Sequence, residues 1–176
     1  KLSKPFLKWA GGKGQLLNKF KELYPQELIN GEIKIYIEPF VGGGAVLFDI
    51  LQNYQIEKAY INDINKELIN CYRCIKANVE EVIKQLDILE KEYLTSEDRT
   101  NYFYKVRDRY NEIQLNAHYD FEKCADFIFL NKTCFNGLYR VNSKGYFNSP
   151  IGRSSSGKIP DIVQADAIRA LSRFLQ

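Results

Sequence analysis

Apolar residues recur at helical spacing along most of the chain. The first such run predicts a helix over residues 14–24, and Pro25 marks its end. A long central stretch alternates apolar and charged positions with the same period, which predicts helices over 66–77, 79–94, 98–116 and 119–131. A last helix is predicted near the end of the sequence, with Asp161 as its N-cap. Its apolar positions are Ile162, Ala165, Ile168, Leu171 and Leu175.

Two short runs of β-favouring residues lie between the first helix and the central stretch. They predict strands over 33–37 and 58–61. The first strand leads into a glycine loop at residues 42–44, and a helix is predicted over 45–51. The order strand, glycine loop, helix, strand is a βαβ unit, in which the two strands lie parallel. The pattern therefore predicts an α/β fold.

The pattern changes again at residues 127–160, a window without a single Asp or Glu. It carries five basic residues, whereas the rest of the chain has slightly more acidic than basic residues. Within it, residues 139–141 and 146–148 flank a turn and predict a β-hairpin. A local basic surface on a near-neutral body favours a polyanionic partner. The alternative is a solvated loop that lacks acidic residues by chance.

Composition limits the class of protein. The chain has 176 residues, of which 45% are hydrophobic and 27% charged, as in a folded globular domain. The apolar runs are too short to predict a membrane span, and no signal peptide is visible. The four cysteines lack the paired spacing of a zinc site, so we expect free thiols, no bound metal and a cytoplasmic location. They are Cys71, Cys74, Cys124 and Cys134.

The glycine loop indicates a bound small molecule. Gly42 and Gly44 fill the first two positions of the dinucleotide fingerprint, but Leu47 stands at the third, which argues against a pyrophosphate and leaves other nucleosides open. Asp63 follows the second predicted strand, where a carboxylate can accept hydrogen bonds from both ribose hydroxyls. The alternative for Asp63 is a cap on the next helix.

A second glycine-containing loop comes before the first helix. Gly11-Gly12-Lys13 is not a phosphate-binding P-loop, because Gly14 follows the lysine in place of Ser or Thr. Trp9 and Lys13 instead suggest a ligand clamp, with an aromatic face beside a cation. The alternative for Trp9 is a place in the core.

Six blocks in this order resemble the DNA adenine methylase (Dam) family and its Dpn-type restriction methylase relatives. They are Lys8-Trp9-Ala10-Gly11-Gly12-Lys13, Glu38-Pro39-Phe40-Val41-Gly42-Gly43-Gly44, Asn62-Asp63-Ile64-Asn65, Leu130-Asn131-Lys132-Thr133, Asn136-Gly137-Leu138-Tyr139-Arg140-Val141-Asn142 and Phe147-Asn148-Ser149-Pro150-Ile151-Gly152-Arg153. Together they span nearly the whole chain.

The resemblance implies a Rossmann-like sheet of an S-adenosylmethionine (AdoMet)-dependent methyltransferase, incomplete in this chain, with an inserted helical and β-hairpin DNA-recognition domain. We expect residues 1–65 to bind AdoMet, 66–160 to recognise the target and 161–176 to return into the methyltransferase domain. The residues implied to surround AdoMet are Trp9, Lys13, Phe40, Gly42, Gly44 and Asp63.

The same resemblance assigns Leu138, Arg140 and Pro150 to the recognition hairpin and Arg153 to a basic position just after it. Independently of the resemblance, Arg is the side chain best suited to the major-groove acceptors of guanine, which favours base reading by Arg140. Lys132 and Lys144 are predicted to contact phosphates. Leu138 and Pro150 suit contact with a thymine methyl, or alternatively packing within the hairpin.

The family's catalytic motif, Asp-Pro-Pro-Tyr, is absent from these 176 residues. We expect it in a following segment or a partner chain. The predicted function is that of a site-specific DNA adenine methyltransferase, which transfers a methyl group from AdoMet to the exocyclic amine of a flipped adenine in duplex DNA, with GATC as the implied site. A cognate restriction endonuclease is the system partner in the restriction-linked case. The alternatives are a catalytically inactive AdoMet- and DNA-binding module and an RNA methyltransferase.

Overall fold

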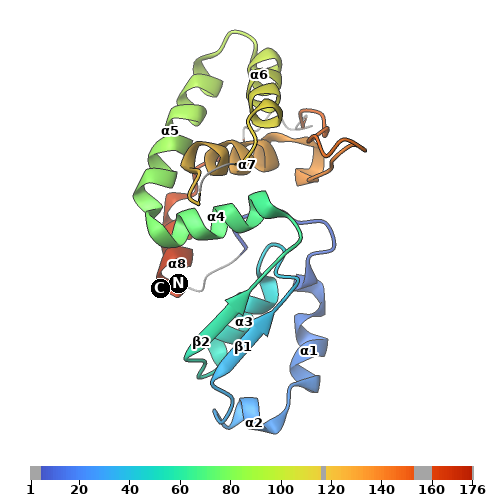
Figure 1. The fold of residues 1–176 in the computed structure, drawn as a ribbon, viewed down its shortest axis with the longest axis vertical. Coiled ribbons are helices and arrows are strands. Elements are labelled where there is room, and N and C mark those ends of the chain that lie inside the picture. Colours follow the sequence, from blue (N-terminus) through green and yellow to red (C-terminus); the bar gives the residue numbers. More distant parts are fainter. Residues whose placement is uncertain (1–4, 116–117, 153–159, 176) are drawn as a thin grey trace.

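The computed structural model describes residues 5–115, 118–152 and 160–175. Figure 1 shows a lower part that contains the strands and an upper part built from helices, with α4 lying between them. Arg153, which the sequence assigns to a basic DNA-facing position, lies outside the described residues.

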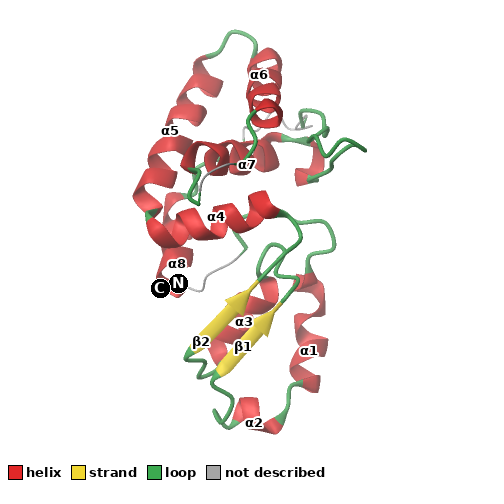
Figure 2. Ribbon diagram, viewed as in Figure 1, coloured by secondary structure: helices red, strands yellow, loops and turns green. Residues whose placement is uncertain are grey.

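The lower part contains the predicted βαβ unit. Strands β1 (Ile35–Glu38) and β2 (Lys58–Ile61) lie parallel, with Ile35 opposite Lys58 and Glu38 opposite Ile61. Helix α3 (Ala45–Asn53) joins them and lies behind the strands in Figure 2. The other elements are the 3₁₀ helix η1 (Lys13–Leu16) and the helices α1 (Leu17–Leu23) and α2 (Gln26–Ile29).

In the described residues, the sheet has only these two strands, so the fold class is a mixed α/β with a small parallel sheet. Along β1, Tyr36 packs against the core and Glu38 is buried. Ile35 and Ile37 alternate with them and are 57% and 68% exposed. Side chains of a strand alternate between faces, so one apolar face of this sheet is open. This arrangement is consistent with an incomplete methyltransferase fold.

The upper part consists of helices. Its helices are α4 (Lys66–Ala77), α5 (Val79–Thr95), α6 (Arg99–Glu112), α7 (Phe121–Thr133) and α8 (Ala165–Phe174). Four of them start at a side chain that accepts a hydrogen bond from the first turn, which explains why local sequence predicts their starts well. These N-caps are Asn65, Asn78, Asp98 and Asp120. Within the part of the chain that the structure describes, none of the helices has the length and apolar character needed to span a bilayer.

Helix α7 is the centre of the core. It packs against α4, α5 and α6, and most of its residues are buried. Its Cys124 lies against the thiols of Cys71 and Cys74 on α4, and all four cysteines are buried and free, as the sequence predicts. Burial raises the pKa of the Cys124 thiol, and a hydrogen bond with Cys124 raises the pKa of Cys74. Both thiols are therefore protonated and unreactive.

Two local predictions differ from the structure. The predicted hairpin arms form one antiparallel bridge, between Val141 and Phe147, and no regular strand. Asp161 is not the cap of the last helix, because α8 begins only at Ala165, after Gln164 in a left-handed conformation. The physical reason lies in the intervening apolar pair. Ile162 is fully buried, and its N–H donates to Glu90 Oε1 at 3.2 Å, so this segment is extended against α5.

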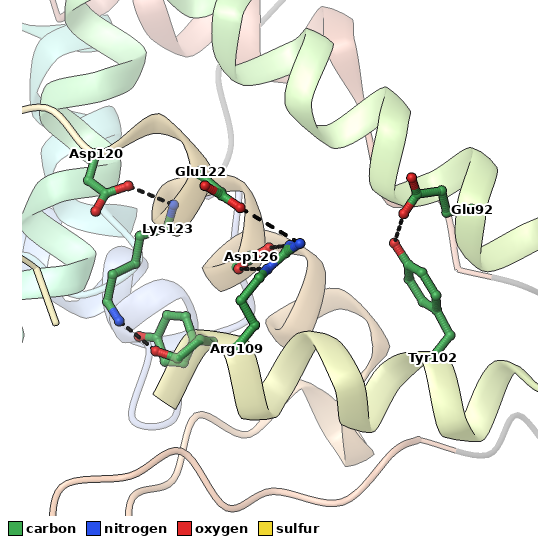
Figure 3. A network of polar contacts seen from close by, with 8 residues as sticks. Glu92, Tyr102, Arg109, Asp120, Glu122, Lys123 and Asp126 are labelled. Carbon is green, nitrogen blue, oxygen red and sulfur yellow. Dashed lines mark hydrogen bonds and ion pairs between the residues drawn. The ribbon is translucent and has the colours of Figure 1, made fainter. Parts of the chain in front are cut away.

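Polar contacts join α6 to its neighbours (Figure 3). The Arg109 guanidinium forms a two-bond ion pair with Asp126 of α7, in which Nε lies 3.0 Å from Oδ2. Lys123 Nζ donates to the carbonyl of Tyr110 near the end of α6. Tyr102 donates to Glu92 of α5 at 2.8 Å. Asp126 is 1% exposed, so its charge depends on the partner that Arg109 provides.

We expect Arg109→Met to destabilise the fold by about 2–4 kcal/mol, less than for a fully buried pair because Arg109 is partly exposed. Burial already raises the pKa of Asp126 to about 6, and removal of Arg109 raises it further. The penalty for a raised carboxyl pKa is present above that pKa and is relieved as the pH falls through it. The stability difference from wild type should therefore shrink from about pH 8 to about pH 5.5.

Urea unfolding at both pH values measures this difference. Arg169→Met is the matched control, because Arg169 forms an equally short two-bond pair with Glu80 at an exposed site. The control should destabilise the fold much less than Arg109→Met, because solvent screens an exposed ion pair. Equal losses of unfolding free energy for the two variants at both pH values would show that the buried charge of Asp126 does not depend on Arg109.

Candidate functional site

A cleft of about 470 Å³ lies between the N-terminal loop and the glycine loop. Phe40 follows β1 and Asp63 follows β2, so the cleft lies at the carboxyl ends of the parallel strands, where α/β folds bind ligands. Its volume suits a small molecule. We call it the glycine-loop cleft. Its lining comprises Pro5, Leu7, Trp9, Ala10, Gly11, Gly12, Lys13, Gly14, Gln15, Phe40, Val41, Gly42, Gly43, Ala45 and Asp63.

The glycine loop is held in shape from two sides. The Gly42 N–H donates to Asp63 Oδ2 at 3.0 Å, and the Tyr72 hydroxyl donates to the Gly42 carbonyl at 2.9 Å. Burial raises the pKa of Tyr72 well above its usual value, so this hydroxyl is a neutral donor. The other oxygen of Asp63, Oδ1, accepts from the Asn65 N–H at 3.0 Å. Asn65, not Asp63, caps α4, so the capping alternative for Asp63 is wrong.

Each carboxylate oxygen has two lone pairs, so Asp63 retains the capacity to accept bonds from a ligand. Its side chain is partly exposed and lines the cleft. The same carboxylate therefore fixes the loop and presents acceptors to the cleft.

Gly44 differs from the other predicted cofactor residues because it does not line the cleft. It precedes α3 with a φ of +82°, where a Cβ would lie 2.7 Å from the Tyr72 hydroxyl and 2.8 Å from the Phe48 ring. Glycine is thus required here by the backbone conformation and by close packing. A cofactor-binding role for Gly44 stays a prediction.

Lys13 closes one side of the cleft. Its Nζ donates to Glu38 Oε1 at 2.9 Å and to the Phe40 carbonyl at 2.6 Å. Glu38 is 5% exposed and also accepts from the Tyr36 hydroxyl at 2.8 Å. Burial and, after it, this hydrogen bond raise the pKa of Tyr36. Sequence reasoning did not select Glu38 as a site residue, although a carboxylate at the last position of a strand before a glycine loop was a usable signal.

Trp9 belongs both to the cleft wall and to the core. Its ring stacks on Tyr139 at 5.5 Å and lies nearly parallel to Phe127 at 6.1 Å. The edge of its indole lies close to Gly42, where a Cβ would lie 2.9 Å from Trp9 Cδ1. The two alternatives for this residue are therefore compatible. Phe40 lines the cleft with its side chain largely in solvent, at 72% exposure.

Residues 138–150, which we call the hairpin segment, carry most of the predicted DNA contacts on an exposed surface. Arg140 is exposed, and its Nε donates to Asn148 Oδ1 at 2.9 Å across the segment. Lys144 is exposed in the turn, where its N–H donates to Asn142 Oδ1. Leu138 is 39% exposed and Pro150 is also exposed.

Lys132 lies apart from this exposed surface. It is partly buried on α7, where its Nζ donates to Gln164 Oε1 at 2.7 Å. Burial lowers the pKa of Lys132. The ammonium keeps two further N–H donors beside the bond to Gln164, and the DNA-binding role of Lys132 stays a prediction.

Comparison with known proteins identifies the family. Residues 9–176 match the family described as D12 class N6 adenine-specific DNA methyltransferase. The chain is 53% identical over 160 residues to a type II methyltransferase, M.MjaIII, of Methanocaldococcus jannaschii, covering 90% of this chain and 55% of the relative. It is 39% identical over 175 residues to the type II methyltransferase M1.LlaDCHI of Lactococcus lactis subsp. cremoris, covering 98% and 55%.

A DNA adenine methylase of Haemophilus influenzae is 35% identical over 158 residues, covering 90% of this chain and 50% of the relative. The chain thus spans about half the length of the curated relatives it matches. Because the family match extends over nearly all of the sequence, the chain belongs to the D12 class N6 adenine-specific DNA methyltransferase family.

Proposed function

We propose that this chain is the AdoMet-binding and DNA-recognising part of a site-specific DNA adenine methyltransferase. The observation that carries the proposal is the glycine-loop cleft. Five residues assigned to AdoMet by resemblance line this one cleft, although they come from three separate stretches of sequence: Trp9, Lys13, Phe40, Gly42 and Asp63. The exposed basic hairpin segment supports duplex DNA as the second ligand.

The chemistry of the cleft fits AdoMet. Asp63 offers carboxylate oxygens to ribose hydroxyls at the end of β2. Trp9 and Phe40 offer aromatic surface for the purine, and the bonds from Asp63 and Tyr72 hold the glycine loop close to the ligand. When bound, AdoMet supplies the methyl group that is transferred. No dinucleotide is needed, because the glycine pattern departs from the pyrophosphate fingerprint at Leu47.

The hairpin segment fits a reader of duplex DNA. Hydrogen bonds to Asn148 orient the Arg140 side chain. A guanidinium has five N–H donors, so others remain for a contact with DNA. An oriented Arg on an exposed ribbon suits guanine in the major groove, whereas Lys144 at the turn suits a phosphate. We propose residues 66–160 as the recognition domain and GATC, which the family resemblance implies, as the site.

The residues that polarise the adenine amine are proposed to come from an Asp-Pro-Pro-Tyr motif outside these 176 residues, because the sequence contains no Pro-Pro pair. The base must leave the stack for that chemistry. A cytoplasmic location and a cognate restriction endonuclease as system partner stay predictions.

The direct test measures methyl transfer by the full-length protein. With radiolabelled AdoMet, we expect label in the adenine of a GATC duplex and much less in a duplex that lacks the site. Binding of both ligands without transfer would favour the inactive binding module. Preferential labelling of single-stranded RNA would favour an RNA methyltransferase.

For the cofactor, Asp63→Ala should weaken AdoMet binding by roughly 10- to 150-fold, because charge-assisted bonds of about 1.5–3 kcal/mol are lost. Part of this loss reflects the freed Gly42 N–H, so Asp63→Asn, which keeps one acceptor, should fall in between. Isothermal titration measures both variants. Asp49→Ala is the control, since Asp49 is a buried carboxylate on α3 that pairs with Lys21 and does not line the cleft. An Asp63→Ala affinity equal to that of the control would exclude the ribose role.

For the DNA, Arg140→Ala should cost about 1–3 kcal/mol on the cognate duplex and much less on a duplex altered at the contacted base pair. Lys144→Ala should weaken every duplex about equally and reduce the salt slope by roughly one charge. Binding constants on cognate and singly substituted duplexes at two salt concentrations separate the two behaviours. An Arg140→Ala loss of the same factor on all duplexes, with a flatter salt slope, would identify Arg140 as a backbone contact.

A further inference from the structure

The side-chain amide of Asn131 joins two loops that are far apart in the sequence. Asn131 is fully buried near the end of α7. Its Oδ1 accepts from the Lys8 N–H at 3.1 Å, and its Nδ2 donates to the Lys8 carbonyl at 2.8 Å. The same Nδ2 donates to the Gly137 carbonyl at 3.2 Å. One amide thus pairs with both backbone groups of Lys8 and also holds Gly137.

These two backbone positions adjoin the two candidate binding surfaces. Lys8 precedes Trp9, which forms a wall of the glycine-loop cleft, and Gly137 precedes Leu138, where the hairpin segment begins. The loops also touch directly, since a Cβ on Gly137 would lie 2.6 Å from Lys8 Cβ. The stack of Trp9 on Tyr139, with centroids 5.5 Å apart, is a second contact between the same two surfaces.

A rearrangement at either surface therefore changes the contacts that hold the other. The fully buried Asn131 amide would lose its hydrogen-bond partners if Lys8 or Gly137 moved, which is costly, so both residues keep their places relative to Asn131. A ligand that fixes Trp9 also fixes Lys8, and through the Asn131 amide it favours one arrangement of Gly137 and of the segment that follows. Coupling between two sites requires such a shared element that both ligands bias.

We propose that Asn131 is a positioning residue that links occupancy of the glycine-loop cleft to the affinity of the hairpin segment for DNA. The inference rests on the proposed function, because it takes AdoMet and duplex DNA as the two ligands. Asn131 touches neither ligand and acts through Lys8 and Gly137. By linkage, cofactor and DNA then raise each other's affinity by the same factor.

The chain contains a matched control for the buried amide. Asn70 on α4 is 1% exposed, and its side-chain amide pairs with both backbone groups of one residue in the same way. Its Nδ2 donates to the Asp120 carbonyl at 2.8 Å, and its Oδ1 accepts from the Asp120 N–H at 3.0 Å. Asp120 begins α7 and does not line the glycine-loop cleft or belong to the hairpin segment. Asn70→Ala therefore removes a comparable pair of hydrogen bonds and leaves the bonds of Asn131 to Lys8 and Gly137 in place.

The experiment uses the full-length protein with sinefungin, a non-reactive AdoMet analogue, and a cognate duplex. The Kd for DNA is measured with and without saturating sinefungin, and the Kd for sinefungin with and without DNA. For the wild type we expect each ratio to be about 5- to 150-fold and the two ratios to be equal. In Asn131→Ala both ratios should fall to about one, whereas Asn70→Ala should keep the wild-type ratio.

Asn131→Asp is a second variant that keeps the acceptor for the Lys8 N–H and loses the donor to the carbonyls of Lys8 and Gly137, so it should also lose the coupling. A role in stability alone would lower the melting temperature and leave the ratio unchanged. The proposal is overturned if both Asn131 variants keep the ratio, or if the wild type binds both ligands with a ratio of one. A wild type that binds neither ligand would instead contradict the proposed function.

Discussion

The satisfaction of loop backbone by buried side-chain amides is the constraint on which this structure depends. The loops around the candidate sites run outside any sheet, and a buried N–H or C=O without a partner is costly. Asn70, Asn111 and Asn131 each pair with both the N–H and the carbonyl of one loop residue. Asn111, for example, accepts from the Phe147 N–H at 2.8 Å and donates to its carbonyl at 3.0 Å. Asn131 and Asn111 thereby fix loops next to the candidate binding surfaces, and Asn70 fixes the N-cap residue of α7.

The same principle explains why Asp63 is both structural and available to a ligand. The bonds from Gly42 and Asn65 fix the carboxylate and the glycine loop before any ligand arrives. A site that is preformed in this way loses less conformational entropy on binding. The contacts of Trp9 with Tyr139 and with Gly42 have the same effect on another part of the cleft lining.

Local patterns predicted the regular elements well and the tertiary connections poorly. The predicted β2 and α4 coincide with residues 58–61 and 66–77, because period and N-cap are encoded within a few positions. The cap at Asp161 was wrong because burial of Ile162 against α5 outweighs a local capping preference. The role of Asn131 left no local signal, since its partner Lys8 is 123 positions away. The cleft residues followed from motif spacing and from a family resemblance, and not from periodicity.

Lys132 shows what a charge count in the sequence does and does not determine. The acid-free window counts it as one more basic residue, but in the fold it lies partly buried on α7 and contacts Gln164. Among the basic residues of the window that the structure describes, Arg140 and Lys144 are exposed, and both lie in the hairpin segment. Sequence therefore fixes how many cations a surface can have, whereas burial decides which of them a polyanion meets. For the described basic residues of this window, the positive charge that solvent reaches most freely is therefore that of Arg140 and Lys144 and not that of Lys132.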